Sequence, residues 1–239
     1  MKKIETFRDV LIVEEGGNCI VSAVDSCGGI GEKINDTFYC ETELVSELTL
    51  RVTVLEIMSL GAMPQFITVS VCNEPKVGNK IIAGFKPIFD EIGNIPFVIS
   101  TEKNIPTVMT AIGISAVGSC SCKTLKLENF QKHDILCLAG TPLVGKEVIE
   151  DYDKMFKISD FKQLLRNEFV GSILPVGSGG VLQESEILKM ESGFDIDFSD
   201  NCDINLTKSA GPASCALFSV RRDKIKTINI PFCQIGTLC

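Results

Sequence analysis

Short apolar runs alternate along the chain with longer stretches in which apolar residues recur every three or four positions. The runs at 10–13 and 19–24 are short and partly β-branched, which predicts buried strands. The stretch 42–60 has helical spacing and stops at Gly61, with Pro64 soon after, which predicts a helix. The same pattern predicts strands at 66–71, 110–117, 134–140, 213–220 and 225–230, and helices at 80–92, 145–152, 159–167 and 182–190. The short run 173–176 leads into the glycine-rich segment 177–180.

This alternation of strands and helices predicts an α/β or α+β fold. The 239 residues suffice for one large domain or two small ones packed together, and a second half begins near residue 141. The sequence shows neither an internal repeat nor a low-complexity linker.

Composition narrows the class of protein. Hydrophobic residues make up 45% and charged residues 23% of the chain, as in ordinary globular proteins. The net charge of −8 disfavours nucleic acid as a partner, because phosphates would be repelled. The N-terminus lacks the apolar core of a signal peptide, and no apolar stretch is long enough to span a membrane. These features predict a cytoplasmic protein without a membrane partner.

The chain has 11 cysteines and only one histidine, His133. No CxxC pair occurs, and several cysteines lie inside apolar runs, which favours reduced, buried thiols that pack as small hydrophobic groups. A zinc or iron–sulfur site is the alternative, although the spacing does not suit the common sites. A catalytic thiol is a further alternative, and it would depend on His133 as its partner.

The segment from Asp25 to Lys33 is the first candidate for chemistry. The buried run 19–24 ends at Asp25, and three glycines follow before Lys33. Glycines let the backbone approach a bulky anion, while the lysine supplies a cation and the aspartate a possible metal ligand. The spacing matches neither GxxxxGK[ST] nor GxGxxG. Taken alone, the segment fits an ordinary glycine-rich turn or a phosphate-binding loop.

Three other polar positions are candidates of the same kind. Glu56 borders the apolar stripe of the predicted helix, where a carboxylate is costly unless it is paired or bound to a metal. Glu102 follows Ser100 and Thr101 in a polar break between apolar segments, and Asp9 precedes the first predicted strand. Each position also has an ordinary explanation. Glu56 could be an exposed or salt-bridged glutamate, 100–102 a simple turn, and Asp9 a surface aspartate.

Together, Asp9, Asp25, Glu56 and Glu102 are four carboxylates in one α/β unit. Oxygen ligands of this kind suit Mg²⁺ that is shared with phosphates. Phosphoryl transfer needs mainly positioning and neutralisation of charge, and it has no obligatory histidine. The set therefore predicts a site for ATP and Mg²⁺.

The order of these segments resembles the aminoimidazole ribonucleotide synthetase (PurM-like) superfamily. The most specific match is LEIMSLGAMP at 55–64, which resembles the family's Ser-Asp-x-x-Ala-Met-Gly-Ala-x-Pro. Asp9 and Val10 resemble the family's Asp-Ala-Ala-Val segment, and Asp25 with 29–33 resembles Asp-Gly-Val-Gly-Thr-Lys. The other matches are Ser100 to Glu102, His133 to Gly140, and Gly179 to Val181.

The chain also departs from the superfamily's pattern. Position 56 is glutamate where most members have aspartate, Val52 replaces an asparagine, and Ser100 and Thr101 replace two glycines. Within the superfamily, STEKNIPTVMTAIG at 100–113 and SAGPASC at 209–215 are most similar to the α-ribazole kinase branch.

The resemblance implies an ATP:nucleoside phosphotransferase that phosphorylates the 5′-hydroxyl of α-ribazole, a step in assembly of the lower ligand of cobalamin. An enzyme like thiamine-monophosphate kinase, or a non-catalytic protein of the hydrogenase-maturation type, is the alternative. The implied fold has an N-terminal ATP- and metal-binding domain over 1–138, with a four-stranded sheet and flanking helices, and a shortened α/β domain over 139–239. Pairing of N-terminal sheets into a barrel would make the protein a homodimer.

The resemblance also implies roles for individual residues. Asp25, Lys33, Glu56 and Glu102 would be catalytic. Asp25, Gly29, Gly31, Lys33, Ser100 and Thr101 would bind ATP, and Asp9, Asp25, Glu56 and Glu102 would bind Mg²⁺. The segments 177–180 and 209–214 are candidates for the pocket of the acceptor.

Overall fold

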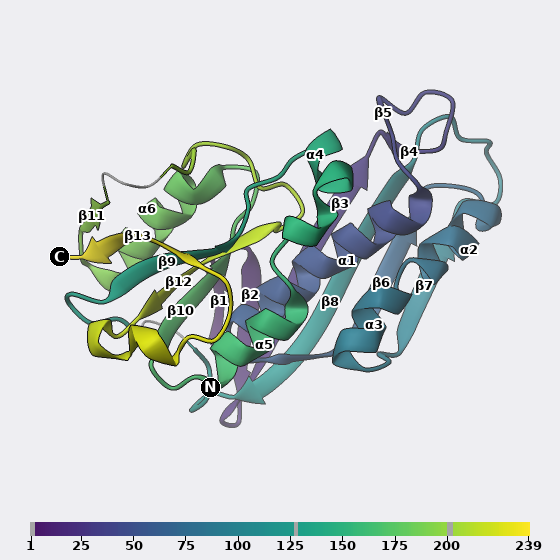
Figure 1. Ribbon diagram of the computed structural model, residues 1–239. Coiled ribbons are helices and arrows are strands. Elements are labelled where there is room, and N and C mark those ends of the chain that lie inside the picture. Colours follow the sequence, from purple (N-terminus) through teal and green to yellow (C-terminus); the bar gives the residue numbers. More distant parts are fainter. Residues whose placement is uncertain (1–2, 127–128, 200–202) are drawn as a thin grey trace. The chain divides into compact units, whose positions relative to one another are not determined.

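The chain divides between Leu125 and Lys126 into two units, shown in Figure 1. The computed structural model describes residues 3–126, 129–199 and 203–239. The division lies earlier than the predicted boundary at residue 138, because β9 (Ile135–Gly140) pairs with two strands of the second unit, β12 and β13. No helix in these described ranges is both long and apolar enough to cross a membrane.

The first unit is built on a six-stranded sheet rather than the four-stranded sheet that was expected. The additional strands lie at the edges, where β1 forms an antiparallel hairpin with β2, and β7 pairs parallel to β6. The order is β1-β2-β3-β8-β6-β7, with β1 (Lys3–Phe7), β2 (Val10–Glu15), β3 (Asn18–Gly28), β6 (Met63–Val71), β7 (Phe97–Thr101) and β8 (Ala111–Ser121).

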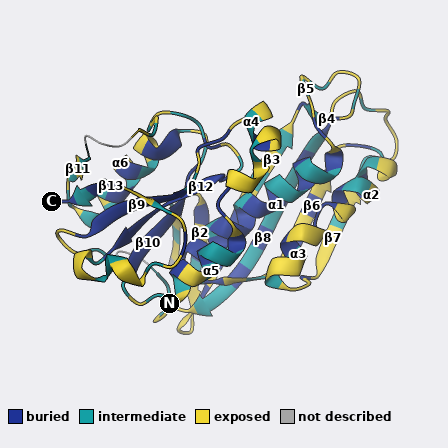
Figure 2. Ribbon diagram, viewed as in Figure 1, coloured by how far each residue is buried: buried dark blue, intermediate teal, exposed yellow. Residues whose placement is uncertain are grey.

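Three helices cover one face of this sheet: α1 (Thr42–Ser59), α2 (Pro75–Ala83) and α3 (Lys86–Ile92) (Figures 1 and 2). Helix α1 packs along β3 and β8 and is buried over much of its surface. The prediction of a single helix over 80–92 is wrong, because the chain breaks at Gly84. A Cβ atom on Gly84 would lie 2.2 Å from the backbone oxygen of Glu43, so the chain passes close to the first turn of α1.

The opposite face of the sheet is not covered by these helices. Within residues 20–26 of β3, 113–119 of β8, 66–70 of β6 and 98–100 of β7, no side chain that points to this face is charged. Strand pairing defines this open face, because directly opposed residues point to the same side. Its exposed apolar side chains include Ile20, Val24, Phe66 and Val98, of which Val24 is 69% exposed. The open face is therefore largely apolar and hydroxyl-bearing.

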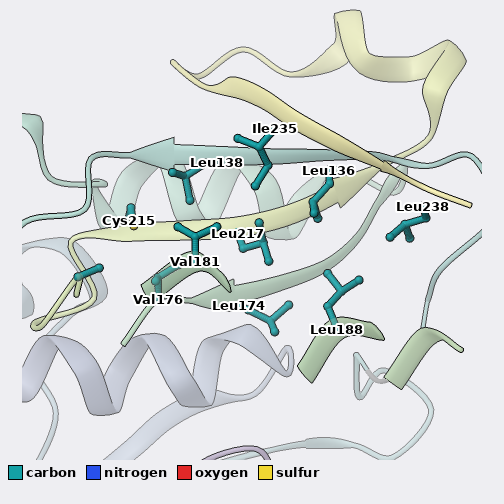
Figure 3. Close-up of a cluster of buried hydrophobic side chains, with 11 residues drawn as sticks. Leu136, Leu138, Leu174, Val176, Val181, Leu188, Cys215, Leu217, Ile235 and Leu238 are labelled. Atoms are coloured by element: carbon teal, nitrogen blue, oxygen red, sulfur yellow. The ribbon is translucent and has the colours of Figure 1, made fainter. Parts of the chain in front are cut away.

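The second unit has a five-stranded sheet of order β10-β12-β9-β13-β11. One buried cluster, drawn in Figure 3, joins strand residues such as Leu136 and Leu217 to Val181 and Leu188 of α6. The remaining elements are α4 (Lys146–Glu150), α5 (Ile158–Arg166), β10 (Val170–Pro175), α6 (Gly180–Ser192), β11 (Ile196–Phe198), β12 (Cys215–Val220) and β13 (Cys233–Leu238), with 3₁₀ helices at Tyr152–Lys154 and Arg222–Thr227.

The strand predicted at 225–230 is therefore wrong. The 3₁₀ helix occupies its first half, and the last strand, β13, begins only at Cys233. The run holds three isoleucines, Ile225, Ile228 and Ile230, separated by polar residues, and a run this short does not distinguish a strand from a 3₁₀ turn.

The expectation of reduced thiols is wrong for two cysteines. Cys19 at the start of β3 and Cys122 just after β8 form a disulfide, with their Cα atoms 5.2 Å apart. The pairing of Asn18 with Ser121 at this end of the ladder brings the two residues together, although 103 positions separate them in sequence. The eight other described cysteines form no disulfide. Burial is confirmed for Cys137 and Cys215, which lie inside strands of the second sheet. The same expectation is wrong for Cys72, which is exposed directly after the end of β6.

Replacing Cys122 with serine should lower the free energy of unfolding under non-reducing conditions. The closed loop is long, so the disulfide is expected to contribute about 2–4 kcal/mol by restricting the unfolded chain. Denaturant unfolding with and without reductant measures this, with Cys72→Ser, which alters an exposed free cysteine, as the control. A wild-type protein whose stability is unchanged by reductant would contradict the assignment.

Candidate functional site

The chemistry-bearing loops meet at one end of the first sheet. Strands β3, β6 and β7 finish at this end and β8 begins there, as the aligned row of Cys27, Ile112, Val71 and Thr101 shows. Residues 29–41, here called the glycine loop, follow β3. Residues 102–110, here called the threonine loop, lead into β8. Sheet pairing therefore places the two loops side by side.

The glycine loop approaches the threonine loop too closely for other residues at two positions. Gly29 has φ +72°, and its N–H donates to the carbonyl of Thr110 at 2.8 Å. A Cβ atom on Gly31 would lie 2.2 Å from Oγ1 of Thr110 and 2.8 Å from Oδ2 of Asp36. These glycines were predicted to cradle phosphate. The N–H of Gly29 is bonded to Thr110, and phosphate binding by Gly29 and Gly31 remains a prediction.

Asp36 joins the two loops. Its Oδ1 accepts from the backbone N–H of Thr110, and its Oδ2 accepts from Thr110 Oγ1 and from the backbone N–H of Lys33, each at 2.7 Å. A carboxylate can accept several hydrogen bonds at once, and such charge-assisted bonds are stronger than neutral ones. Asp36 therefore fixes the backbone next to Lys33.

The side chain of Lys33 is held by a second carboxylate. Its Nζ lies 2.5 Å from Oε2 of Glu74 and donates to the carbonyl of Thr107 at 3.1 Å. Glu74 also accepts from the backbone N–H and the hydroxyl of Thr107, each at 3.0 Å. The bond from Lys33, followed by that from the Thr107 amide, lowers the pKa of Glu74 to about 2.

Asn73 completes the connection between the loops and the sheet. Its Nδ2 donates to Thr107 Oγ1 at 2.7 Å and to the carbonyl of Met109 at 2.6 Å, and its Oδ1 accepts from the backbone N–H of Ala111. The side chain of Asn73 is fully buried, where unpaired polar groups would be costly. The threonine loop is therefore anchored at several points.

Glu32 is a structural residue of the glycine loop. Its Oε2 accepts from the backbone N–H and Oγ1 of Thr42 at the start of α1, and both its oxygens bind Nζ of Lys80. A carboxylate at a helix N-terminus is favoured by unsatisfied amides and by the helix dipole. These bonds, led by that from Lys80, lower the pKa of Glu32.

Asp25 lies inside β3 and not at its end, because β3 continues to Gly28. It points to the helix-covered face, aligned with Ile114 and Val69 of the neighbouring strands. Burial raises the pKa of Asp25, and a hydrogen bond from the Ser26 amide partly offsets this effect. Asp25 thus lies on β3 four positions before the glycine loop begins.

Glu102 opens the threonine loop. Its Oε1 accepts from the backbone N–H groups of Asn104 and Ile105 at 2.6 and 3.1 Å, and these bonds lower the pKa of its carboxyl. Ser100 and Thr101 precede it in β7 and point to opposite faces of the sheet. All three residues line a pocket of about 480 Å³ between α2 and the end of β7.

The four carboxylates predicted to bind Mg²⁺ do not form a ready-made cluster. Among the described residues, no three Asp, Glu, His or Cys side chains are grouped so that they could hold a metal ion. Asp9 is exposed in the turn between β1 and β2. Glu56 lies about 21 Å along the axis of α1 from Thr42, because the helix rises 1.5 Å per residue. Glu32 is bonded to Thr42, so Glu56 lies far from Glu32. Metal binding by these residues remains a prediction.

The two segments predicted for the acceptor pocket lie in the second unit and touch one another. The N–H of Ala210 donates to the carbonyl of Gly177 at 3.1 Å. Ser214 is buried and bonds to the backbone of Leu143, so its hydroxyl has a structural role. Their assignment to an acceptor remains a prediction.

Sequence reasoning missed Asp36, Asn73, Glu74, Thr107 and Thr110, although they make most of the contacts of the site. Thr107 and Thr110 lie within the segment 100–113 that carried the family resemblance, which was the only available signal. Asp36, Asn73 and Glu74 each stand in short polar turns, and their partners are up to 74 positions away.

Gly31→Ala should destabilise the first unit through a collision with the Asp36–Thr110 contact. Glycine-to-alanine change at a positive φ costs free energy in any setting, and overpacking adds about 1–3 kcal/mol. Gly93→Ala is the matched control, because Gly93 has φ +90° and open space around it. Denaturant unfolding should show a larger loss for Gly31→Ala, and equal losses would contradict the close approach.

Comparison with known proteins establishes the fold. No protein-family model and no curated protein sequence matches the chain. A thiamine monophosphate kinase from Aquifex aeolicus has a TM-score of 0.70 at 13% identity, covering 98% of this chain and 89% of that chain. A structure of AaThiL complexed with AMPPCP and TMP has a TM-score of 0.68 at 14% identity, covering 96% and 84%.

A structure of hydrogenase maturation protein HypE in complex with ATP has a TM-score of 0.66 at 10% identity, covering 92% of this chain and 76% of that chain. Thiamine-monophosphate kinase and HypE are members of the PurM-like superfamily. Similarity at such low identity concerns the fold alone, and the chain shares the mixed α/β fold of these structures. The class predicted from alternating strands and helices is therefore confirmed.

Proposed function

We propose that this chain is an ATP-dependent small-molecule kinase. The observation that carries the proposal is Lys33, a lysine held by two acceptors where the glycine and threonine loops meet. The fold supports it, since the similar structures include complexes with AMPPCP and with ATP. A cation beside a glycine-shaped turn at the end of a sheet suits the phosphates of a nucleotide.

The proposed acceptor is the 5′-hydroxyl of α-ribazole. Support comes from the segment 100–113, the basis of the resemblance to α-ribazole kinases, because it forms the end of β7, the threonine loop and the start of β8. Its Thr107 and Thr110 bind Glu74 and Asp36. The segment thus builds the loop beside Lys33, where an acceptor would have to meet the nucleotide.

In the proposed mechanism the chain contributes mainly positioning and charge. Lys33 would bind phosphate oxygens, while Gly29, Gly31 and Asp36 hold its backbone in place. The acceptor hydroxyl would attack the terminal phosphorus in line with the leaving oxygen, a reaction that places few demands on a general base. Binding of Mg²⁺ by Asp9, Asp25, Glu56 and Glu102 remains a prediction, and no step of the mechanism is assigned to the metal.

Two alternatives rest on specific observations. Thiamine phosphate as acceptor is favoured by the similarity to the AaThiL complex that contains TMP. A non-catalytic maturation protein is favoured by the similarity to HypE, together with the absence of a carboxylate cluster among the described residues.

An acceptor screen tests these readings. The purified protein is incubated with ATP and Mg²⁺ and with α-ribazole, thiamine phosphate or an aminoimidazole precursor, and release of ADP is measured. We expect release that depends on α-ribazole, with Lys33→Met lowering it at least tenfold through loss of a charged contact worth about 1.5–3 kcal/mol. Turnover with thiamine phosphate alone would show that thiamine phosphate, and not α-ribazole, is the acceptor. A protein that shows no turnover with any acceptor and does not bind ATP would refute both kinase proposals.

We also propose that the chain forms a homodimer through the open face of its first sheet. The open face carries no charged side chain on β3, β8, β6 or β7 and includes exposed Val24 and Val98, which is the composition of an interface core. Val24→Asp should convert the dimer to a monomer, because it would bury an unpaired charge. Met190→Asp, at a 77% exposed position of the second unit, is the control. Sedimentation that shows a monomeric wild type would refute the proposal.

A further inference from the structure

Glu74 uses its carboxylate in an unusual way for its position. It is the N-cap residue of α2, yet its side chain makes no capping hydrogen bond to that helix. N-cap side chains usually accept from the first free amides of their own helix. The carboxylate of Glu74 instead binds Lys33 of the glycine loop and Thr107 of the threonine loop.

Lys33, Glu74 and Thr107 form a closed set of contacts. Lys33 donates to both Glu74 and the carbonyl of Thr107, and Thr107 donates to Glu74 through its amide and its hydroxyl. Each residue thus contacts the other two. An ammonium group has three N–H donors, so two of those on Lys33 are directed to these acceptors and one remains for a ligand.

The contacts hold a flexible side chain in one place. A lysine side chain loses up to about 2 kcal/mol of conformational entropy when it is immobilised, which a ligand would otherwise have to offset. Two acceptors on two different loops already restrict the Nζ of Lys33, whose side chain keeps 21% exposure. The partly exposed side chain of Lys33 therefore holds its ammonium in a fixed position.

We infer that Glu74 is a positioning residue for an anionic ligand, holding the ammonium of Lys33 where it meets a phosphate of the nucleotide. This inference rests on the proposed nucleotide binding and adds to it a residue that touches no ligand. Glu74 acts through Lys33 and, by its bonds to Thr107, keeps the two loops at a fixed separation. The opposite possibility is that Glu74 competes with phosphate for Lys33, in which case its removal would tighten binding.

The experiment is a double-mutant cycle on nucleotide affinity. AMPPCP is titrated by calorimetry into the wild type, Glu74→Gln, Lys33→Met and the double variant, and the free energy of unfolding of each is measured in parallel. Glutamine keeps the shape of the side chain and an acceptor for the Thr107 amide, but it removes the charge that holds Lys33. Asp90→Asn is the control, because Asp90 forms an exposed ion pair with Lys86 away from both loops.

We expect Glu74→Gln to weaken AMPPCP binding about tenfold, the effect of one charged hydrogen bond, with Asp90→Asn unchanged. In the Lys33→Met background, Glu74→Gln should then change affinity less than twofold, because its effect passes through the lysine. A purely structural role would give the same loss in both backgrounds and would overturn the inference. Tighter binding by Glu74→Gln would overturn it as well.

The cycle separates this inference from the function on which it rests. If the wild type binds AMPPCP and Lys33→Met binds it equally well, the positioning role is refuted while nucleotide binding stands. If the wild type does not bind AMPPCP at all, both the proposed nucleotide binding and the role of Glu74 are refuted.

Discussion

Strands β3 and β8 pair over eleven positions, from Asn18 opposite Ser121 to Gly28 opposite Ala111. One end of this ladder places Cys19 against the chain that follows β8, where the disulfide to Cys122 closes it. The other end decides where the glycine loop leaves the sheet and where the threonine loop enters it. A shift of register by one residue would turn Asp25 from the helix-covered face to the open face. The arrangement of the candidate site thus depends on this one pairing.

At the loop end of the ladder, carboxylates mainly satisfy donors of the protein itself. Asp36 binds two backbone amides and a hydroxyl, Glu32 binds the start of α1, and Glu102 binds its own loop. Because these carboxylates accept hydrogen bonds from donors of the protein itself, they lie near Lys33 without forming an unpaired cluster of negative charge.

The family resemblance and the fold agree, but they carry different weight for function. Similarity of fold at 10–14% identity is compatible with a kinase and with a maturation protein, because both occur among the similar structures. Function must therefore be argued from the site. The closed set of Lys33, Glu74 and Thr107 is the part of this site that departs most from a simple surface turn.

Local pattern in the sequence determined the α/β class, the helix now seen as α1 and the glycine-rich turn after β3, since these depend on residues close together in the chain. It did not determine the edge strands β1 and β7, the break at Gly84, the disulfide or the 3₁₀ helix at Arg222–Thr227. Strand β7, the break at Gly84 and the disulfide depend on partners that only folding brings near. Strand β1 and the 3₁₀ helix are local elements, but their residue patterns did not distinguish them. Likewise, the sequence indicated Asp25 and Lys33 as candidates. Tertiary structure decided that Asp36 and Glu74 bind the lysine, that Asn73 anchors the threonine loop, and that Glu56 lies far along α1 from Glu32. Hydrogen bonds between residues 33 to 74 positions apart leave no periodic trace in a sequence, and this is the physical reason why the structure was needed to find them.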